Sequence, residues 1–268
     1  MIIIRLTGGF GNQLFQFSAA LLLAKSHKIS EIIIDDSALD KYKSKNINIL
    51  IKYLDLSKFD VEISIRKKFI SKFRIPKIFP FFVFVSDVNF RKALVVKFPF
   101  YILDGYFQDC FDQEWFEKIA YDIKGALNFT EFRKNNPHEC AVHIRGGDFL
   151  ELGWDAVSPP EYYYSAMKFM EQIYGVIKFS IITDDVVFAN KIINKNDFEC
   201  DFCCGSIGED FQNIGSFSYR ILSSSTFSFW ASFIGVEDGL VIAPELWTTD
   251  RKRLLKLPRE ITHDKITW

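Results

Sequence analysis

The chain has 268 residues, enough for one large domain or two small ones. Nearly half of its residues are apolar and a quarter are charged, a balance that excludes disorder, collagen and coiled coil as its main character. Its 33 basic side chains nearly cancel its 34 acidic ones, which argues against a dedicated nucleic-acid binder, because such proteins carry a basic surplus. No apolar run approaches the roughly 20 residues that span a bilayer, and Arg5 follows the short N-terminal apolar run instead of preceding it. We therefore expect a cytoplasmic protein.

The N-terminal segment predicts an α/β unit. Residues 2–4 are three isoleucines, which are typical of a buried strand, and residues 32–34 repeat this pattern. Between them lie a glycine-rich loop over residues 8–13 and a helix over residues 14–26 that is apolar on all sides. This helix is therefore expected to be buried.

A second α/β region begins near residue 140. Strands are expected over residues 141–144, 179–182, 221–222 and 240–243, with helices that begin near residues 160, 186 and 227. Strands that alternate with helices predict parallel sheets. The polar segment 128–137 is expected to separate two domains, residues 1–135 and 136–268.

The N-terminal glycine loop is a candidate ligand site. Gly9 and Gly11 let backbone approach a ligand, and the helix start that follows favours an anion. Asn12 beside them is an amide suited to sugar hydroxyls. A dinucleotide site is the alternative, with Asp35 as its acid, but the third glycine of that pattern would fall at Leu14. A tight turn without a ligand is also open.

A second candidate site follows the strand near residue 140. His143 and Arg145 alternate with apolar residues, so both side chains are expected on one face of the sheet. Arg145 offers a planar fork for phosphate oxygens, and His143 can hydrogen-bond a base or ribose. Gly146 and Gly147 would keep the site open. Structural ion pairs at a sheet edge are the alternative.

Hydroxyls and acids complete this second region. Ser223, Ser224, Ser225 and Thr226 precede a predicted helix, where they can cradle a phosphate or cap the helix. The acid pairs 35–36 and 184–185 end predicted strands and could be metal ligands. Since neighbouring residues of an extended segment point to opposite faces, each pair offers one carboxylate to a site, and we favour a turn role for at least one member. Asp210 lies near a helix start, where it could cap the helix or accept N–H groups from guanine.

Residues 64–98 differ from the rest of the chain. They hold nine basic side chains, one acid and several interleaved phenylalanines. A solvated basic face is one interpretation, and contact with anionic lipid or a lipid-linked substrate is the other. The five cysteines show no zinc-site spacing and are expected to be reduced thiols.

Together these segments resemble bacterial α-1,2-fucosyltransferases of glycosyltransferase family 11. The resemblance is carried by GGFGNQLFQFSAALLLA, LDGYFQD, VHIRGGD, PEYYYSAM, ITDD, SSSTFSFWASFIG and IAPELW, which occur in the family's order along most of the chain. Each block is weak alone, and their joint occurrence is specific.

The resemblance implies a GT-B-like α/β fold with two Rossmann-like domains and a cleft between them. GDP-fucose would be held mainly by residues 136–268, and residues 1–135 would form the acceptor side. The reaction would be an inverting transfer of fucose, without a metal or cofactor, to the 2-hydroxyl of a galactose-containing oligosaccharide or lipid-linked glycan in O-antigen synthesis. The protein would contact no nucleic acid and could lie peripherally on the membrane.

The resemblance also assigns residue roles. Arg145 would bind the diphosphate, Asp210 the guanine, and Ser225 and Thr226 the phosphates. The expected donor site comprises Gly9, Gly11, His143, Arg145, Asp185, Asp210, Ser224, Ser225 and Thr226, and the expected catalytic residues are Asn12, Arg145 and Asp148. Asp148 is a candidate base that could instead orient Arg145. Gly146 stands where the related H-x-R-R-x-D motif has a second arginine.

Two other functions stay open at this point. The glycine loop would also fit an oxidoreductase that uses NAD(P), and the basic, Phe-rich stretch would fit a non-catalytic, membrane-associated glycan-binding protein.

Overall fold

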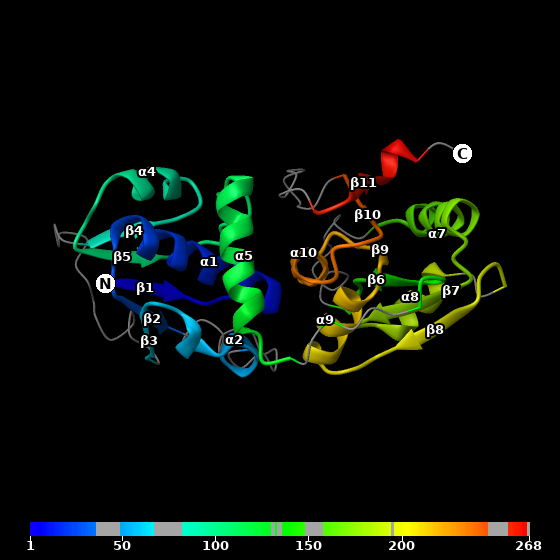
Figure 1. Cartoon of the computed structure of the whole chain (residues 1–268), viewed down its shortest axis with the longest axis horizontal. Helices are drawn as coiled ribbons and strands as arrows, with labels where there is room; N and C mark the ends of the chain where they lie inside the picture. The colour runs from blue at the N-terminus through cyan, green and yellow to red at the C-terminus, as the bar shows by residue number, and fades with distance from the viewer. Residues whose placement is uncertain are drawn as a thin grey trace. The chain divides into compact units, whose positions relative to one another are not determined.

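The computed structural model describes residues 1–35, 49–66, 82–129, 132, 136–147, 158–193, 196–245 and 257–266. The chain forms two compact units, Met1–Asn128 and Phe129–Trp268. Each unit is built around a parallel sheet (Figure 1).

The sheet of the first unit has β1 at its centre. Its strands are β1 (Ile2–Arg5), β2 (Glu31–Asp35), β3 (Glu62–Ile65), β4 (Phe82–Val85) and β5 (Phe100–Leu103), in the spatial order β3-β2-β1-β5-β4. Every pairing is parallel. The isoleucines of β1 and β2 are fully buried, as their continuous apolar runs predict.

Helix α1 (Phe10–His27) is buried nearly all round because three other helices and the sheet surround it. These are α2 (Ile49–Tyr53), α4 (Phe90–Val95) and α5 (Gln113–Ala126), and a short 3-10 helix, η2 (Leu56–Lys58), follows α2. The expected buried helix is confirmed, but it begins four residues earlier than expected. Gly8 takes a φ of +72° and makes the turn after β1, so that Gly11 and Asn12 already lie in the first helical turn.

The sheet of the second unit has β6 next to β9. Its strands are β6 (Glu139–Ile144), β7 (Lys178–Thr183), β8 (Cys200–Cys203), β9 (Tyr219–Ile221), β10 (Leu240–Ala243) and β11 (Glu260–Thr262), in the order β11-β10-β9-β6-β7-β8. All pairings are parallel. Counted within the unit, this is the order 6-5-4-1-2-3 of a dinucleotide-binding Rossmann sheet.

Within its described residues, the second unit has the helices α7 (Pro160–Tyr174), α8 (Val186–Ile192), α9 (Ile207–Ser216) and α10 (Thr226–Ile234), with the short η3 (His263–Lys265) near its end. Two buried polar side chains fix α10 and the strands around it. Tyr162 Oη donates to the carbonyls of Leu222 (2.6 Å) and Ile242 (3.3 Å), just after β9 and in β10. The guanidinium of Arg220 donates to Ser232 O and Val236 O at the far end of α10, which suits the negative end of the helix dipole.

Both units thus confirm the expected α/β, Rossmann-like architecture. In each sheet, the strand order reverses between two neighbouring strands, β1 and β5 in the first unit and β6 and β9 in the second. Open α/β sheets bind ligands outside the carboxyl ends of their strands at this switch point. Among the described helices, none has the length and apolar character needed to cross a bilayer.

Candidate functional site

His143 and Ser223 meet at the switch point of the second unit. His143 lies on β6 and Ser223 follows β9, and His143 Nδ1 is 2.7 Å from Ser223 Oγ. Both side chains are almost fully buried. Burial, together with the charge of Arg145, lowers the pKa of His143 from 6.5 to about 3. The imidazole is therefore neutral near pH 7 and bridges the two strands.

Arg145 follows β6 and forms an ion pair with Asp184, which follows the neighbouring β7. Arg145 Nη1 lies 2.6 Å from Asp184 Oδ2, and 28% and 31% of the two side-chain surfaces are exposed. The other carboxylate oxygen, Oδ1, accepts the Gly146 N–H at 3.0 Å. One carboxylate therefore holds both the guanidinium and the backbone that carries it.

Both glycines after Arg145 are required by their surroundings. A Cβ at Gly146 would lie 2.7 Å from the Phe188 ring and 3.1 Å from Asp185 Cβ. A Cβ at Gly147 would overlap Asp184, and its φ is +33°. An arginine at position 146, as in the related motif, would need Phe188 to move.

The two acids after β7 have different partners, as expected for neighbours in an extended segment. Asp184 holds Arg145, whereas Asp185 caps α8 by accepting the Phe188 N–H at 2.9 Å. Asp185 is among the expected donor-site residues, whereas Asp184 is expected only as a member of the acid pair 184–185. Asp184 reaches Arg145 because β7 pairs with β6, and the sequence alone does not show this pairing.

The hydroxyl run after β9 shapes the start of α10. Ser225 is the N-cap and accepts the Phe227 N–H at 3.3 Å, while Ser223 is bonded to His143. Ser224 is buried and Thr226, the first helical residue, is partly exposed. The N-cap of α10 and the positive end of its dipole therefore lie at the switch point, next to the Arg145 segment.

Asp210 is not the cap of α9. Ser206 caps that helix, in a capping box with Glu209, and Asp210 Oδ1 accepts the Gly205 N–H at 2.9 Å. Burial raises the pKa of Asp210, the Gly205 bond lowers it, and the nearby Glu209 and Asp184 charges raise it. Asp210 therefore lies within electrostatic range of the Arg145–Asp184 pair.

In the first unit, the start of α1 and the turn after β5 bring four amide side chains to the switch point. Gln13 Nε2 donates to Gly8 O, and Gln16 Nε2 donates to Thr7 Oγ1 and to Gly105 O after β5. Gln108, after β5, donates to Asn12 Oδ1 at 2.9 Å. Gly9 is the N-cap of α1, and a Cβ there would meet open space.

Several expected residues lie outside the described part of the chain. These are Asp148, Asp36 and the basic residues of segment 67–81. Asp35 is fully buried at the end of β2.

The second unit therefore presents a guanidinium, a helix start and a second carboxylate over four neighbouring strand ends. A guanidinium and the free N–H groups of a helix start both bind phosphate oxygens. A carboxylate such as that of Asp210 can accept N–H groups of a base. The arrangement suits an anionic nucleotide.

The comparison with known families decides the class. A family model described as Glycosyl transferase family 11 matches residues 1–262. The chain belongs to glycosyl transferase family 11. The O-antigen biosynthesis glycosyltransferase WbnK of Escherichia coli is 26% identical, with 90% of this chain and 93% of that protein aligned. An alpha-1,2-colitosyltransferase of Escherichia coli is 23% identical, with 92% of each chain aligned.

Solved structures resemble this family 11 chain in fold. The fucosyltransferase NodZ from Bradyrhizobium has a TM-score of 0.58 at 13% identity, covering 87% of this chain and 92% of that chain. A structure of POFUT1 in complex with GDP has a TM-score of 0.50 at 11% identity, covering 97% and 96%. This likeness is consistent with the GT-B-like class expected for the two sheets.

The neutral state of His143 predicts a loss of stability in acid. The unfolded imidazole gains a proton near pH 6.5, but the folded one only near pH 3, so the unfolded state binds more protons between these values. The free energy of unfolding should fall by up to about 1.4 kcal/mol per pH unit across that window from this group alone. Urea unfolding from pH 7 to 4 should show a shallower fall for His143→Gln. An unchanged slope in the variant would contradict the assignment.

Proposed function

We propose that this family 11 glycosyltransferase transfers fucose from GDP-fucose to the 2-hydroxyl of a galactose-containing acceptor during O-antigen synthesis. The two curated relatives support this, because one is named for O-antigen biosynthesis and the other for an alpha-1,2 transfer. A structure of NodZ soaked with GDP-fucose shares the fold, with a TM-score of 0.59 at 14% identity. Colitose, the sugar in the second relative's name, is the competing donor sugar.

The observation that carries the proposal is the clamped guanidinium of Arg145 beside the start of α10. During transfer, the acceptor oxygen attacks the anomeric carbon while the bond from that carbon to the β-phosphate oxygen breaks. GDP leaves with the electron pair, so negative charge grows on the β-phosphate. Fixed donors aimed at such developing charge typically contribute several kcal/mol each. Arg145 and the α10 N–H groups would supply this stabilisation, so the reaction would need no metal or other cofactor.

The other residues receive roles on the same basis. Asp210 would accept the guanine N–H groups, and Ser224, Ser225, Thr226 and the neutral His143 would shape the phosphate site. Asp185 would act indirectly, through the cap of α8 beside Gly146. Asp148 would take the proton of the attacking hydroxyl.

Residues 136–268 would thus form the donor side and residues 1–135 the acceptor side. Gly9 and Gly11 of the first unit would let the donor approach the start of α1, and Asn12 would hydrogen-bond the reacting groups. An NAD(P) oxidoreductase is disfavoured because Leu14 replaces the glycine that its fingerprint needs. Protection against heating by GDP, but not by NAD, would separate the two.

The first test is a GDP-release assay with GDP-fucose or GDP-linked colitose and a panel of galactosides. Arg145→Ala should lower turnover by at least about 100-fold, as expected when a donor to the developing charge is lost. The variant should unfold at nearly the wild-type temperature, because Arg145 is partly exposed. A chelator should leave wild-type turnover unchanged. Wild-type turnover in Arg145→Ala, or rescue of a chelated enzyme by manganese, would refute this mechanism.

The clamp predicts a difference between the two neighbouring acids. Asp184→Asn keeps a similar shape but loses the charge that holds Arg145, so GDP should bind about tenfold more weakly, as for loss of a charge-assisted bond. Asp185→Asn is the matched control, because asparagine caps helices as well as aspartate does. Calorimetric titration with GDP measures both. Tighter GDP binding by Asp184→Asn would mean that Asp184 competes with the ligand instead of positioning the arginine.

We also propose that the surface around α4 contacts anionic lipid at the inner face of the membrane. Val88 and Val95 are 96% and 81% exposed, and Arg91, Lys92 and Lys97 are exposed around them. Exposed apolar and basic side chains together are typical of interfacial contact. Such a position would bring the enzyme to a lipid-linked acceptor.

Liposome flotation tests this contact. The variant Val88→Ser/Lys92→Gln/Val95→Ser should lose binding to phosphatidylglycerol vesicles by about tenfold, since each basic residue near an anionic surface contributes about 1 kcal/mol. The matched control is Val187→Ser/Lys191→Gln, which removes exposed residues of the same kinds from α8. Equal binding by both variants would exclude the α4 surface.

A further inference from the structure

The switch point of the first unit carries a second candidate binding site. The loop after β1 and the turn after β5, residues 104–110, lie side by side there, because β1 and β5 are adjacent parallel strands. Gln108 on the turn donates to Asn12 on the loop at 2.9 Å. The two segments therefore form one polar surface at the place where an open α/β sheet binds ligands.

The turn is held from several directions. Asp87 accepts the N–H groups of Tyr106, at 3.2 Å, and of Phe107, and Gln16 Nε2 donates to Gly105 O at 3.1 Å. Gly105 is required, because a Cβ there would overlap the Asp87 carboxylate. Phe107 takes a φ of +57°, which is rare for a bulky residue, and its ring is fully buried against Phe90. Such a backbone is kept only where its surroundings fix it.

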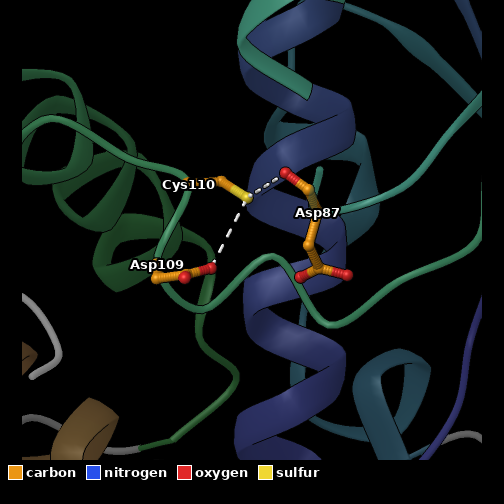
Figure 2. A group of neighbouring side chains, drawn as sticks. All are labelled: Asp87, Asp109 and Cys110. Carbon is orange, nitrogen blue, oxygen red and sulfur yellow. Dashed lines mark hydrogen bonds between the residues drawn. The ribbon is translucent and has the colours of Figure 1, made fainter. Parts of the chain in front are cut away.

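Asp87, Asp109 and Cys110 belong to this clamp, and hydrogen bonds connect them to one another and to the turn. Figure 2 shows the Cys110 thiol directed at the backbone Asp87 O, 3.4 Å away, and at Asp109 Oδ1, 3.9 Å away. Burial and the two nearby carboxylates raise the pKa of Cys110 to about 12. The Cys110 thiol is therefore protonated near pH 7 and can donate hydrogen bonds. The Asp87 carboxylate is already used by the turn.

The clamped turn presents an aromatic ring and polar groups outward. Tyr106 is 43% exposed although its backbone is fixed, and Asp109 beside Gln108 is exposed. A pyranose has an apolar C–H face and a rim of hydroxyls. An aromatic ring complements the first, and amides and carboxylates complement the second. A ring on a rigid turn loses little freedom when a ligand binds.

We propose that the 104–110 turn binds the acceptor sugar, with the galactose ring stacked on Tyr106 and its hydroxyls bonded by Asp109 and the Asn12–Gln108 pair. Gln108 acts as a positioning residue. The Gln108 amide donates to Asn12 Oδ1, so the Asn12 amide is held in one orientation, with Nδ2 close to Gly8. This inference rests on the proposed function and names the acceptor side of it.

Tyr106→Ala, Tyr106→Phe and a control, Tyr121→Ala, test the stacking. Tyr121 is 78% exposed on α5 of the same unit. Tyr106→Ala should raise KM for the best galactoside about tenfold and leave KM for GDP-fucose and the affinity for GDP unchanged. Tyr106→Phe keeps the ring and should recover most of the acceptor affinity that Tyr106→Ala loses, whereas Tyr121→Ala should stay within about twofold of wild type. Gln108→Leu should lower kcat more than it raises KM, since it frees Asn12.

Saturation-transfer NMR with methyl β-galactoside and lactose adds a readout that needs no turnover. Tyr106→Ala should lose the signal that wild type gives, with an unchanged circular dichroism spectrum. An active Tyr106→Ala enzyme with an unchanged acceptor KM, or with a change in the donor KM alone, would overturn the inference while the proposed function stands. A wild-type protein that binds GDP-fucose but neither binds nor fucosylates any galactoside would overturn both. If the wild-type protein bound galactosides without turnover, and Tyr106→Ala abolished that binding, the result would support the sugar subsite and reject the proposed fucose transfer.

Discussion

The carboxylate of Asp184 determines how the second unit presents its charge. One oxygen pairs with Arg145 and the other accepts the Gly146 N–H, so side chain and backbone are fixed by the same group. The pair lies at neighbouring strand ends, where it is partly shielded from water, and Coulomb interactions there are stronger than on an open surface. The glycine pair, the caps of α8 and α10 and the buried His143–Ser223 bond all bring backbone close to this point. In the proposed function, the guanidinium held by this carboxylate would bind the nucleoside diphosphate.

Both units have a parallel sheet with a switch point, and they differ in the side chains that lie there. In the second unit the switch point is charged, as a phosphate requires, and buried histidine and serine side chains link its strands. In the first unit the corresponding position is lined by amides, an aromatic ring and carboxylates, which match a neutral sugar. A transferase needs one surface of each kind, so this division of chemistry supports the assignment of the donor and acceptor sides.

Much of this organisation could be predicted from the sequence. Continuous isoleucine runs gave the buried strands, and alternation of strands with helices gave parallel sheets. His143, Arg145 and the hydroxyl run were identified because strand ends and helix starts are local features. Choosing between Asp184 and Asp185 was not possible, because the choice depends on which neighbouring strand each carboxylate faces. The start of α1 was predicted four residues too late. Gly8, with a φ of +72°, makes the turn, while Gly11 is already helical, and the sequence does not distinguish the two glycines.

The acceptor turn could not be predicted for a similar reason. Its conformation is set by Asp87, which lies 20 residues before Phe107 and reaches it only because β4 and β5 pair. The strand order β1-β5-β4 is likewise a property of the whole sheet. A motif such as LDGYFQD marks the turn, but its hydrogen-bond partners come from other elements.

The contact between Gly146 and Phe188 constrains how this enzyme can change over generations. A second arginine at position 146 would collide with the ring that now fills that space. An arginine there would require the Phe188 ring to move or the side chain at 188 to become smaller. A lineage that gains the second arginine would therefore be expected to change residue 188 as well.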